Sequence, residues 1–95
     1  MPTLMRTALV DFGLYLEAEK GYSPKTTHAY RSDLRNFMEV LATRDWSGTV
    51  EEIDAPAIRA WIVAMKARNL TNRSIARRLH ALRSFWRFLL VPCYL

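Results

Sequence analysis

The chain has 95 residues and a formal net charge of +5 at pH 7, with 51% hydrophobic and 24% charged residues. These values are typical of one ordered globular domain and exclude a disordered tail. The single cysteine, Cys93, excludes an intrachain disulfide and a cysteine-based zinc site. No apolar run approaches the ~20 residues of a membrane span, and Asp11 interrupts the N-terminal apolar stretch too early for a signal peptide. We therefore expect a cytoplasmic domain without a metal or other cofactor.

The basic residues are concentrated in the second half of the chain. Residues 1–54 contain 6 basic and 9 acidic residues, whereas residues 55–95 contain 8 basic residues and no acidic one. Such an asymmetry is typical of proteins that bind nucleic acid or an anionic membrane. A membrane surface would need bulky apolar side chains beside the basic ones on one exposed face, and only Phe88 meets this requirement. The pattern therefore favours a nucleic acid and no membrane.

The first two helices are predicted from apolar residues that recur with the period of a helix. The first helix spans about residues 3–20 and stops at Gly21, which suits the left-handed position after a helix. The second has Ser23 as N-cap and Pro24 at its first position, and it continues to about Ala42. Its outward side in the first turns carries four polar or basic residues, with Arg31 at the edge: Lys25, His28, Ser32 and Arg35.

A polar connection over residues 43–53 leads to a third predicted helix. This helix has Asp54 as its N-cap candidate, Pro56 in its first turn and Asn69 as a plausible stop. No segment of the chain alternates in the way that a strand does. Together with a fourth helix from Thr71, the elements predict a compact all-α bundle of four or five helices, in one domain over residues 1–95.

The fourth helix, residues 71–90, carries five arginines and no acidic residue. Thr71 is its predicted N-cap, because its hydroxyl can accept a bond from the free N–H groups of the first turn. An apolar stripe recurs at spacings of four and three residues: Ile75, Leu79, Leu82, Trp86 and Leu89. The opposite side is polar or basic: Arg73, Arg77, His80, Ser84 and Arg87, with Arg78 and Arg83 on the flanks. We therefore expect one side to face the core and the other a polyanion.

Two basic helix faces in one small domain favour duplex DNA as the partner. The major groove is about 12 Å wide and admits a helix. Lysines and arginines would contact phosphates, while His28, Asn72, Arg73 and Arg77 could reach base edges. Trp46, Trp61 and Trp86 are interpreted as core or rim packing instead of base-stacking platforms, since Trp61 and Trp86 lie on apolar stripes.

Two sequence blocks resemble a known family over nearly the full length of the chain. The first runs from Gly21 through Ser23 and Thr26 to Tyr30, Asp33-Leu34 and Phe37, and is similar to the pattern S-x-x-T-x-x-x-Y-x-x-D-L-x-x-F. The second, Leu70-Thr71 followed by residues 74–85, resembles the Xer signature L-S-A-L-R-S-F. Both blocks are similar to the N-terminal core-binding, SAM-like domain of tyrosine recombinases and phage integrases.

The resemblance implies a domain of four or five helices that grips one face of a recombination half-site, while a separate C-terminal catalytic domain grips the other. It also implies that the second and fourth helices lie toward the major groove, and that other recombinase protomers contact the first helix. The matched motif nominates Lys25, Thr26, Arg77 and Arg83. Together with the residues found from the helical faces, the candidate DNA contacts are Lys25, Thr26, His28, Arg31, Arg35, Asn72, Arg73, Ser74, Arg77, His80 and Arg83.

The chain also departs from the family pattern. His80 stands where the family usually has serine, and the chain ends about where the family continues into its catalytic domain. Tyr94 has no arginines around it that could form a catalytic site, so it is not expected to be a nucleophile. We expect no catalytic residue in this chain.

Two alternatives to DNA binding follow from the same residues. A helical protein–protein interaction module could dock its basic half on an acidic partner, and Phe88 and Arg87 would then contribute to that surface. An enzyme finds no support, because the sequence has no paired carboxylates, nucleophile–base pair, metal set or phosphate loop.

Overall fold

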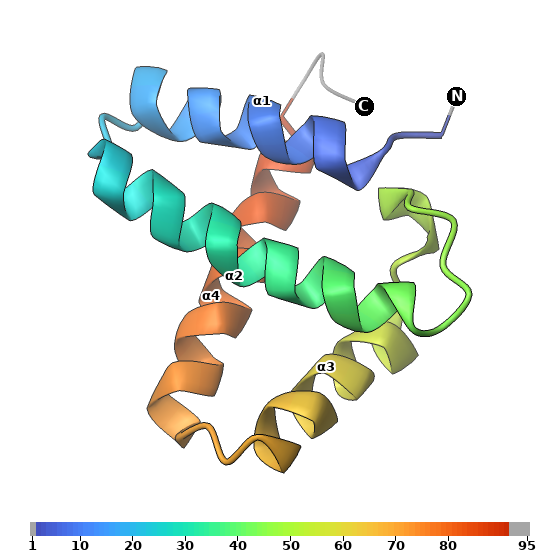
Figure 1. The fold of residues 1–95 in the computed structure, drawn as a ribbon. Helices are drawn as coiled ribbons and strands as arrows, with labels where there is room; N and C mark the ends of the chain where they lie inside the picture. The colour runs from blue at the N-terminus through green and yellow to red at the C-terminus, as the bar shows by residue number, and fades with distance from the viewer. Residues whose placement is uncertain (1, 92–95) are drawn as a thin grey trace.

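The computed structural model describes residues 2–91 and contains four α-helices (Figure 1). They are α1 (Met5–Ala18), α2 (Pro24–Ala42), α3 (Ala55–Ala67) and α4 (Asn72–Leu89), with a short 3-10 turn, η1 (Val50–Glu52), before α3. The predicted all-α fold is confirmed, and among its helical elements only the 3-10 turn was not predicted. Within residues 2–91 there is no β-strand, although an isolated bridge pairs Leu4 with Thr49.

The helix starts follow the predicted capping residues. The Ser23 Oγ accepts a hydrogen bond from the Thr26 N–H at 3.2 Å, and the Asp54 Oδ1 accepts one from the Ala57 N–H at 2.9 Å. Each cap satisfies one of the backbone donors that a first helical turn leaves unpaired. Local chemistry thus fixes where α2 and α3 begin.

The helix ends are also set locally. Gly21 and Asn69 have φ angles of 69° and 61°, the left-handed region that glycine and asparagine tolerate best. The Asn69 turn leads after two residues into α4, so the two helices form an open V in Figure 1. The predicted stops at both positions are confirmed.

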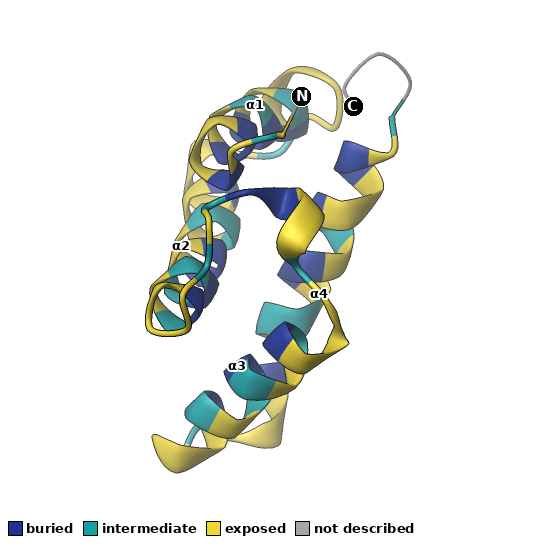
Figure 2. Ribbon diagram, turned by 90° about the vertical axis from the view of Figure 1, so that its right-hand side faces the viewer, coloured by how far each residue is buried: buried dark blue, intermediate teal, exposed yellow. Residues whose placement is uncertain are grey.

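The helices form two layers. In Figure 1, α1 and α2 lie side by side and antiparallel, and α4 crosses behind both. Figure 2 shows these layers edge-on, with the buried residues of α1 and α2 facing those of α4 and α3. The molecule is accordingly flat, with principal extents of 36 × 31 × 16 Å.

Aromatic rings fill the space between the layers. Phe12 of α1 lies edge-on to Phe85 of α4 with ring centroids 5.4 Å apart, and Tyr15 contacts Phe88 at 5.0 Å. Buried leucines and methionines surround these rings. Burial of such side chains contributes about 1.5–3 kcal/mol each, so this cluster dominates the stability of the bundle.

The core face of α4 differs from the predicted stripe. Trp86 is 37% exposed and Leu79 is half-buried, whereas Phe88, which we expected outside the core, is only 5% exposed. The stripe prediction is confirmed at Ile75, Leu82 and Leu89, which are buried. It was wrong about Trp86 and Phe88, because α1 packs against the side of α4 that bears Phe85 and Phe88. The opposite edge of the predicted stripe faces the open angle between α3 and α4.

The polar connection before α3 is held against the N-terminus of α1. The Met5 N–H donates to the Gly48 carbonyl at 2.8 Å, and the Val50 N–H donates to the Thr3 carbonyl at 2.9 Å. The Thr3 N–H in turn donates to Glu51 Oε1 at 2.8 Å. This part of the chain is therefore an ordered extension of the bundle.

The predictions about Cys93 and Tyr94 fall outside the described residues. No helix within residues 2–91 is long and apolar enough to cross a bilayer.

Candidate nucleic-acid interface

The N-terminal half of α4 presents basic side chains to solvent. Thr71 caps the helix by accepting a hydrogen bond from the Ser74 N–H at 3.1 Å, and its hydroxyl donates to Ser74 Oγ at 3.1 Å. Asn72, Arg73 and Arg77 follow and are all exposed. Because the positive end of the helix dipole lies here, this turn favours an anion such as a phosphate.

The first turns of α2 supply a second basic surface. Lys25, His28, Ser32 and Arg35 are exposed, as the helical wheel predicts, and so is Thr26, which the family motif nominates. Thr26 Oγ1 also lies 3.0 Å from Ser23 Oγ, so its hydroxyl is tied to the cap of its own helix.

The basic surface of α4 contacts α2 near the middle of that helix, at Asp33 and Tyr30. The Arg77 guanidinium donates through one terminal nitrogen to Asp33 Oδ1 at 2.9 Å. One turn away on each helix, the ring of His80 lies edge-on to that of Tyr30, with centroids 6.0 Å apart. The candidate residues at the start of α2 and in the first half of α4 therefore lie on either side of one helix crossing.

Tyr30 lies at this crossing and is uncharged at neutral pH. Burial raises the pKa of its hydroxyl above the ordinary value of 10.0, and the neighbouring Tyr22 acts in the same direction. The Tyr22 ring lies edge-on at 5.7 Å. At neutral pH the hydroxyl is protonated, so it adds no negative charge to the basic surface.

Arg31 is placed apart from the other candidates. Its side chain is half-buried, and a Cβ added at Gly13 of α1 would lie only 2.9 Å from its Cδ. The stem of Arg31 thus packs on the bare backbone of α1, in a space that exists because residue 13 is glycine.

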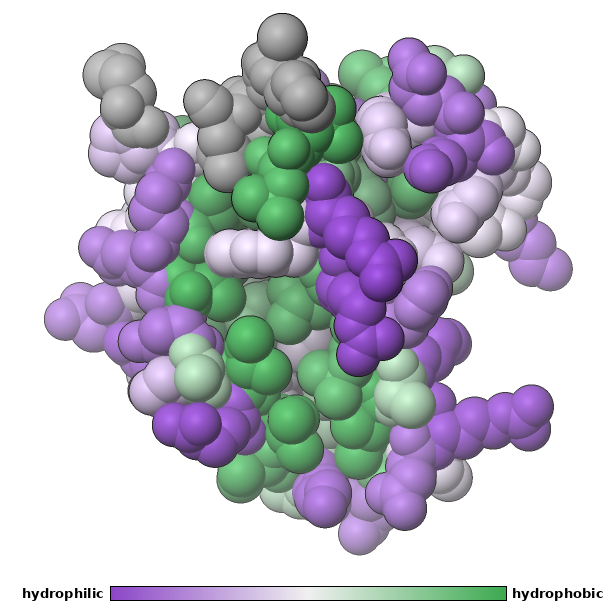
Figure 3. All heavy atoms as spheres, turned by 180° about the vertical axis from the view of Figure 1, so that it is seen from behind, coloured by the Kyte–Doolittle hydropathy of each residue, from purple (hydrophilic) through white to green (hydrophobic). Residues whose placement is uncertain are grey.

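Arg83 lies on the other flank of α4. It lines a hollow of about 450 Å³ between α3 and α4, together with Leu79 and Trp86. Figure 3 shows apolar side chains gathered on this rear face, with strongly polar groups around them. Arg83 was expected to contact DNA, but its position in this hollow favours packing beside Trp86.

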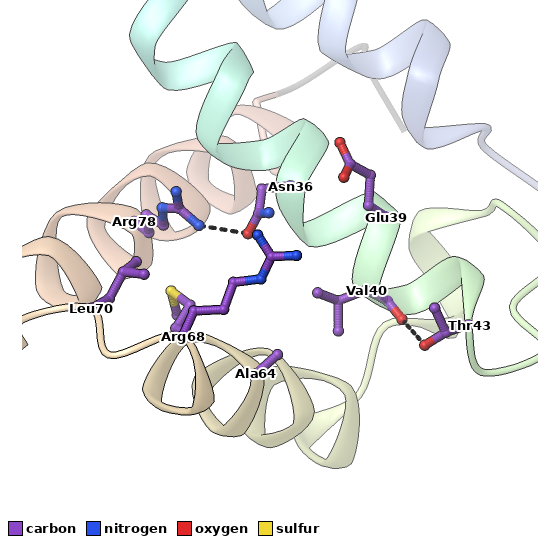
Figure 4. Close-up of a pocket in the computed structure, with 9 residues that line it drawn as sticks. Asn36, Glu39, Val40, Thr43, Ala64, Arg68, Leu70 and Arg78 are labelled. Carbon is purple, nitrogen blue, oxygen red and sulfur yellow. Dashed lines mark hydrogen bonds between the residues drawn. The ribbon is translucent and has the colours of Figure 1, made fainter.

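A polar network behind the basic surface was not anticipated from the sequence. Asn36 Oδ1 accepts hydrogen bonds from the Trp61 Nε1–H at 2.8 Å and from Arg78 at 2.6 Å (Figure 4). The Nε of Arg78 also lies 3.6 Å from Asp33 Oδ1. The only sequence signal was the placement of two hydrogen-bonding residues, Asp33 and Asn36, one turn apart on the inner flank of α2.

Fold and charge together define an all-α domain with one strongly basic, acid-free helix. The family model for the phage integrase N-terminal SAM-like domain matches residues 9–91. The chain therefore belongs to this family, and the resemblance seen in its two sequence blocks is confirmed. No solved structure matches the chain significantly.

Curated relatives include tyrosine recombinases of several bacteria. Tyrosine recombinase XerC of Lacticaseibacillus casei (strain BL23) is 36% identical over 81 residues, which cover 85% of this chain and 27% of the relative. XerC of Pelotomaculum thermopropionicum is 36% identical over 83 residues, which cover 83% of this chain and 27% of that relative. XerD of Oceanobacillus iheyensis is 28% identical over 87 residues, which cover 92% of this chain and 29% of that relative. The chain thus spans less than a third of their length.

Proposed function

We propose that this chain binds double-stranded DNA through α2 and α4, as the non-catalytic N-terminal domain of a site-specific tyrosine recombinase. In a full-length recombinase the domain grips one side of the half-site and so positions a catalytic domain on the other. Neighbouring recombinase protomers are its further partners.

The observation that carries this proposal is the acid-free basic surface of α4 and its junction with α2. Exposed arginines and the dipole of a capped helix start act on the same anion, and they lie beside the crossing with α2. Phosphate contacts position such a domain, while Asn72 and Arg73 at the start of α4 are suited to read base edges.

The alternative, docking on an acidic protein, depended partly on an exposed Phe88. Since Phe88 lies in the core, that surface loses its apolar centre. We therefore propose duplex DNA, and not an acidic protein, as the partner of this basic surface.

The test is a titration of the chain with a labelled duplex of about 30 base pairs across a range of salt concentrations. We expect binding that weakens steeply with salt, because each phosphate contact adds about −0.9 to the slope of log K against log salt. The double variant Arg73→Ala/Arg77→Ala should make that slope less steep, by about 0.9 for each of the two side chains that contacts a phosphate.

The matched control is Arg6→Ala/Arg59→Ala. It removes the same charge from exposed positions on α1 and α3 and should leave the slope unchanged. Equal effects of the two double variants would rule out the α4 surface as the binding site, and an absence of binding at low salt would rule out DNA binding altogether.

A further inference from the structure

A buried carboxylate lies directly beneath the proposed DNA-binding surface. The Asp33 side chain is 7% exposed, and its Oδ1 accepts the hydrogen bond from Arg77. We propose that Asp33 is a positioning residue, which holds the Arg77 guanidinium in the orientation that binds a DNA phosphate. This inference rests on the proposed function.

The neighbouring contacts hold Asp33 in place. Arg78 lies between Asp33 and Asn36, and Asn36 is bonded in turn to Trp61 of α3. Figure 4 shows the Arg78 side chain reaching across from α4 to Asn36 on α2. A buried carboxylate is unfavourable without its partners, and this favours the contact between Arg77 and Asp33 in the free protein.

The contact leaves most of Arg77 free for DNA. The Arg77 side chain is 62% exposed, and a guanidinium has five N–H donors, of which the carboxylate engages one end. An arginine that is already ordered loses less side-chain entropy on binding than a freely rotating one. Asp33 therefore favours phosphate binding although its own charge is negative.

Two opposing expectations make the idea testable. If Asp33 were only a negative charge near DNA, Asp33→Asn would strengthen binding. If it positions Arg77, Asp33→Asn should weaken binding at moderate salt, by about two- to tenfold, the loss typical of one side chain that must be ordered on binding. Glu39→Gln is the matched control, since Glu39 is exposed on the same helix and its neutralisation changes the net charge equally.

The effect of Asp33 must also depend on Arg77. In an Arg77→Ala background, Asp33→Asn should no longer weaken DNA binding, because the side chain that Asp33 positions is gone. An undiminished effect in that background would show that Asp33 acts merely through the fold and would overturn the proposal. Tighter binding by Asp33→Asn, to the same degree as by Glu39→Gln, would also overturn it.

Arg77→Lys also tests whether Asp33 positions Arg77, and it leaves the buried carboxylate of Asp33 unchanged. Lysine keeps the charge but lacks the planar fork that can hold a carboxylate and a phosphate together. We expect Arg77→Lys to bind DNA more weakly than the unmodified chain but more tightly than Arg77→Ala, because it keeps the charge and loses only the positioning. Affinity equal to that of the unmodified chain would contradict positioning. If the unmodified chain bound no DNA, the proposed function itself would fail, whereas the outcomes above leave that function intact.

Discussion

The rings of Phe37 and Trp61 stack with centroids 4.6 Å apart, and the same indole donates its N–H to Asn36. This pair joins α2 to α3 through apolar contact and a hydrogen bond at once. Trp61 is fully buried, so the ring also fills the largest single volume between these helices.

Trp61→Phe should therefore destabilise the domain even though it preserves an aromatic ring. The smaller ring leaves a cavity and removes the donor to Asn36, and together we expect a loss of about 1–3 kcal/mol in the free energy of unfolding. Urea denaturation followed by circular dichroism measures this loss. Trp86→Phe, at a partly exposed position, should change the same quantity by no more than about 0.5 kcal/mol; a similar loss in both variants would contradict the burial pattern.

Phe88 provides a second test of the core. Its ring lies 5.5 Å from that of Phe12 and 5.0 Å from that of Tyr15, centroid to centroid. Phe88→Ala should cost about 3–5 kcal/mol, a large part of the stability of a small domain. Thermal or urea melting measures the loss, and Leu90→Ala, at an exposed position two residues on, is the control. A Phe88→Ala domain as stable as its parent would mean that α4 presents its other side to the core.

Helix positions and caps could be predicted from the sequence because they depend on neighbouring residues. Ser23, Asp54 and Thr71 each bond to a backbone N–H three residues on, and Gly21 and Asn69 adopt positive φ within their own turns. Such signals need no knowledge of which helix packs on which. The helices themselves indicated the all-α fold class, and the two family blocks added the SAM-like family.

The rotation of α4 and the polar network could not be predicted in this way. Arg77 and Asp33 are 44 residues apart in sequence, and Trp61 and Asn36 are 25 apart, so their pairing depends on tertiary packing. The apolar residues of α4 cover more than one side of the helix, and α1 packs against the side with Phe85 and Phe88. Periodicity alone could not choose between that side and the one with Trp86.

The free energy of unfolding should depend on pH through the contact that joins Glu51 to Thr3. The hydrogen bond from the Thr3 N–H lowers the pKa of the Glu51 carboxyl below its ordinary value of 4.5. A lowered pKa means that the ionised form is favoured in the folded state. The contribution of Glu51 to stability is therefore complete above the pKa of the unfolded state and is lost as pH falls through the pKa of the folded state.

Glu51→Gln removes this contribution at neutral pH and should make the domain slightly less stable than its parent there. The two stabilities should converge toward pH 3, as followed by urea midpoints, while Glu17→Gln, an exposed change of equal charge on α1, serves as the control. A difference between Glu51→Gln and its parent that stays constant from neutral pH to pH 3 would show that the charge of Glu51 contributes nothing to this attachment.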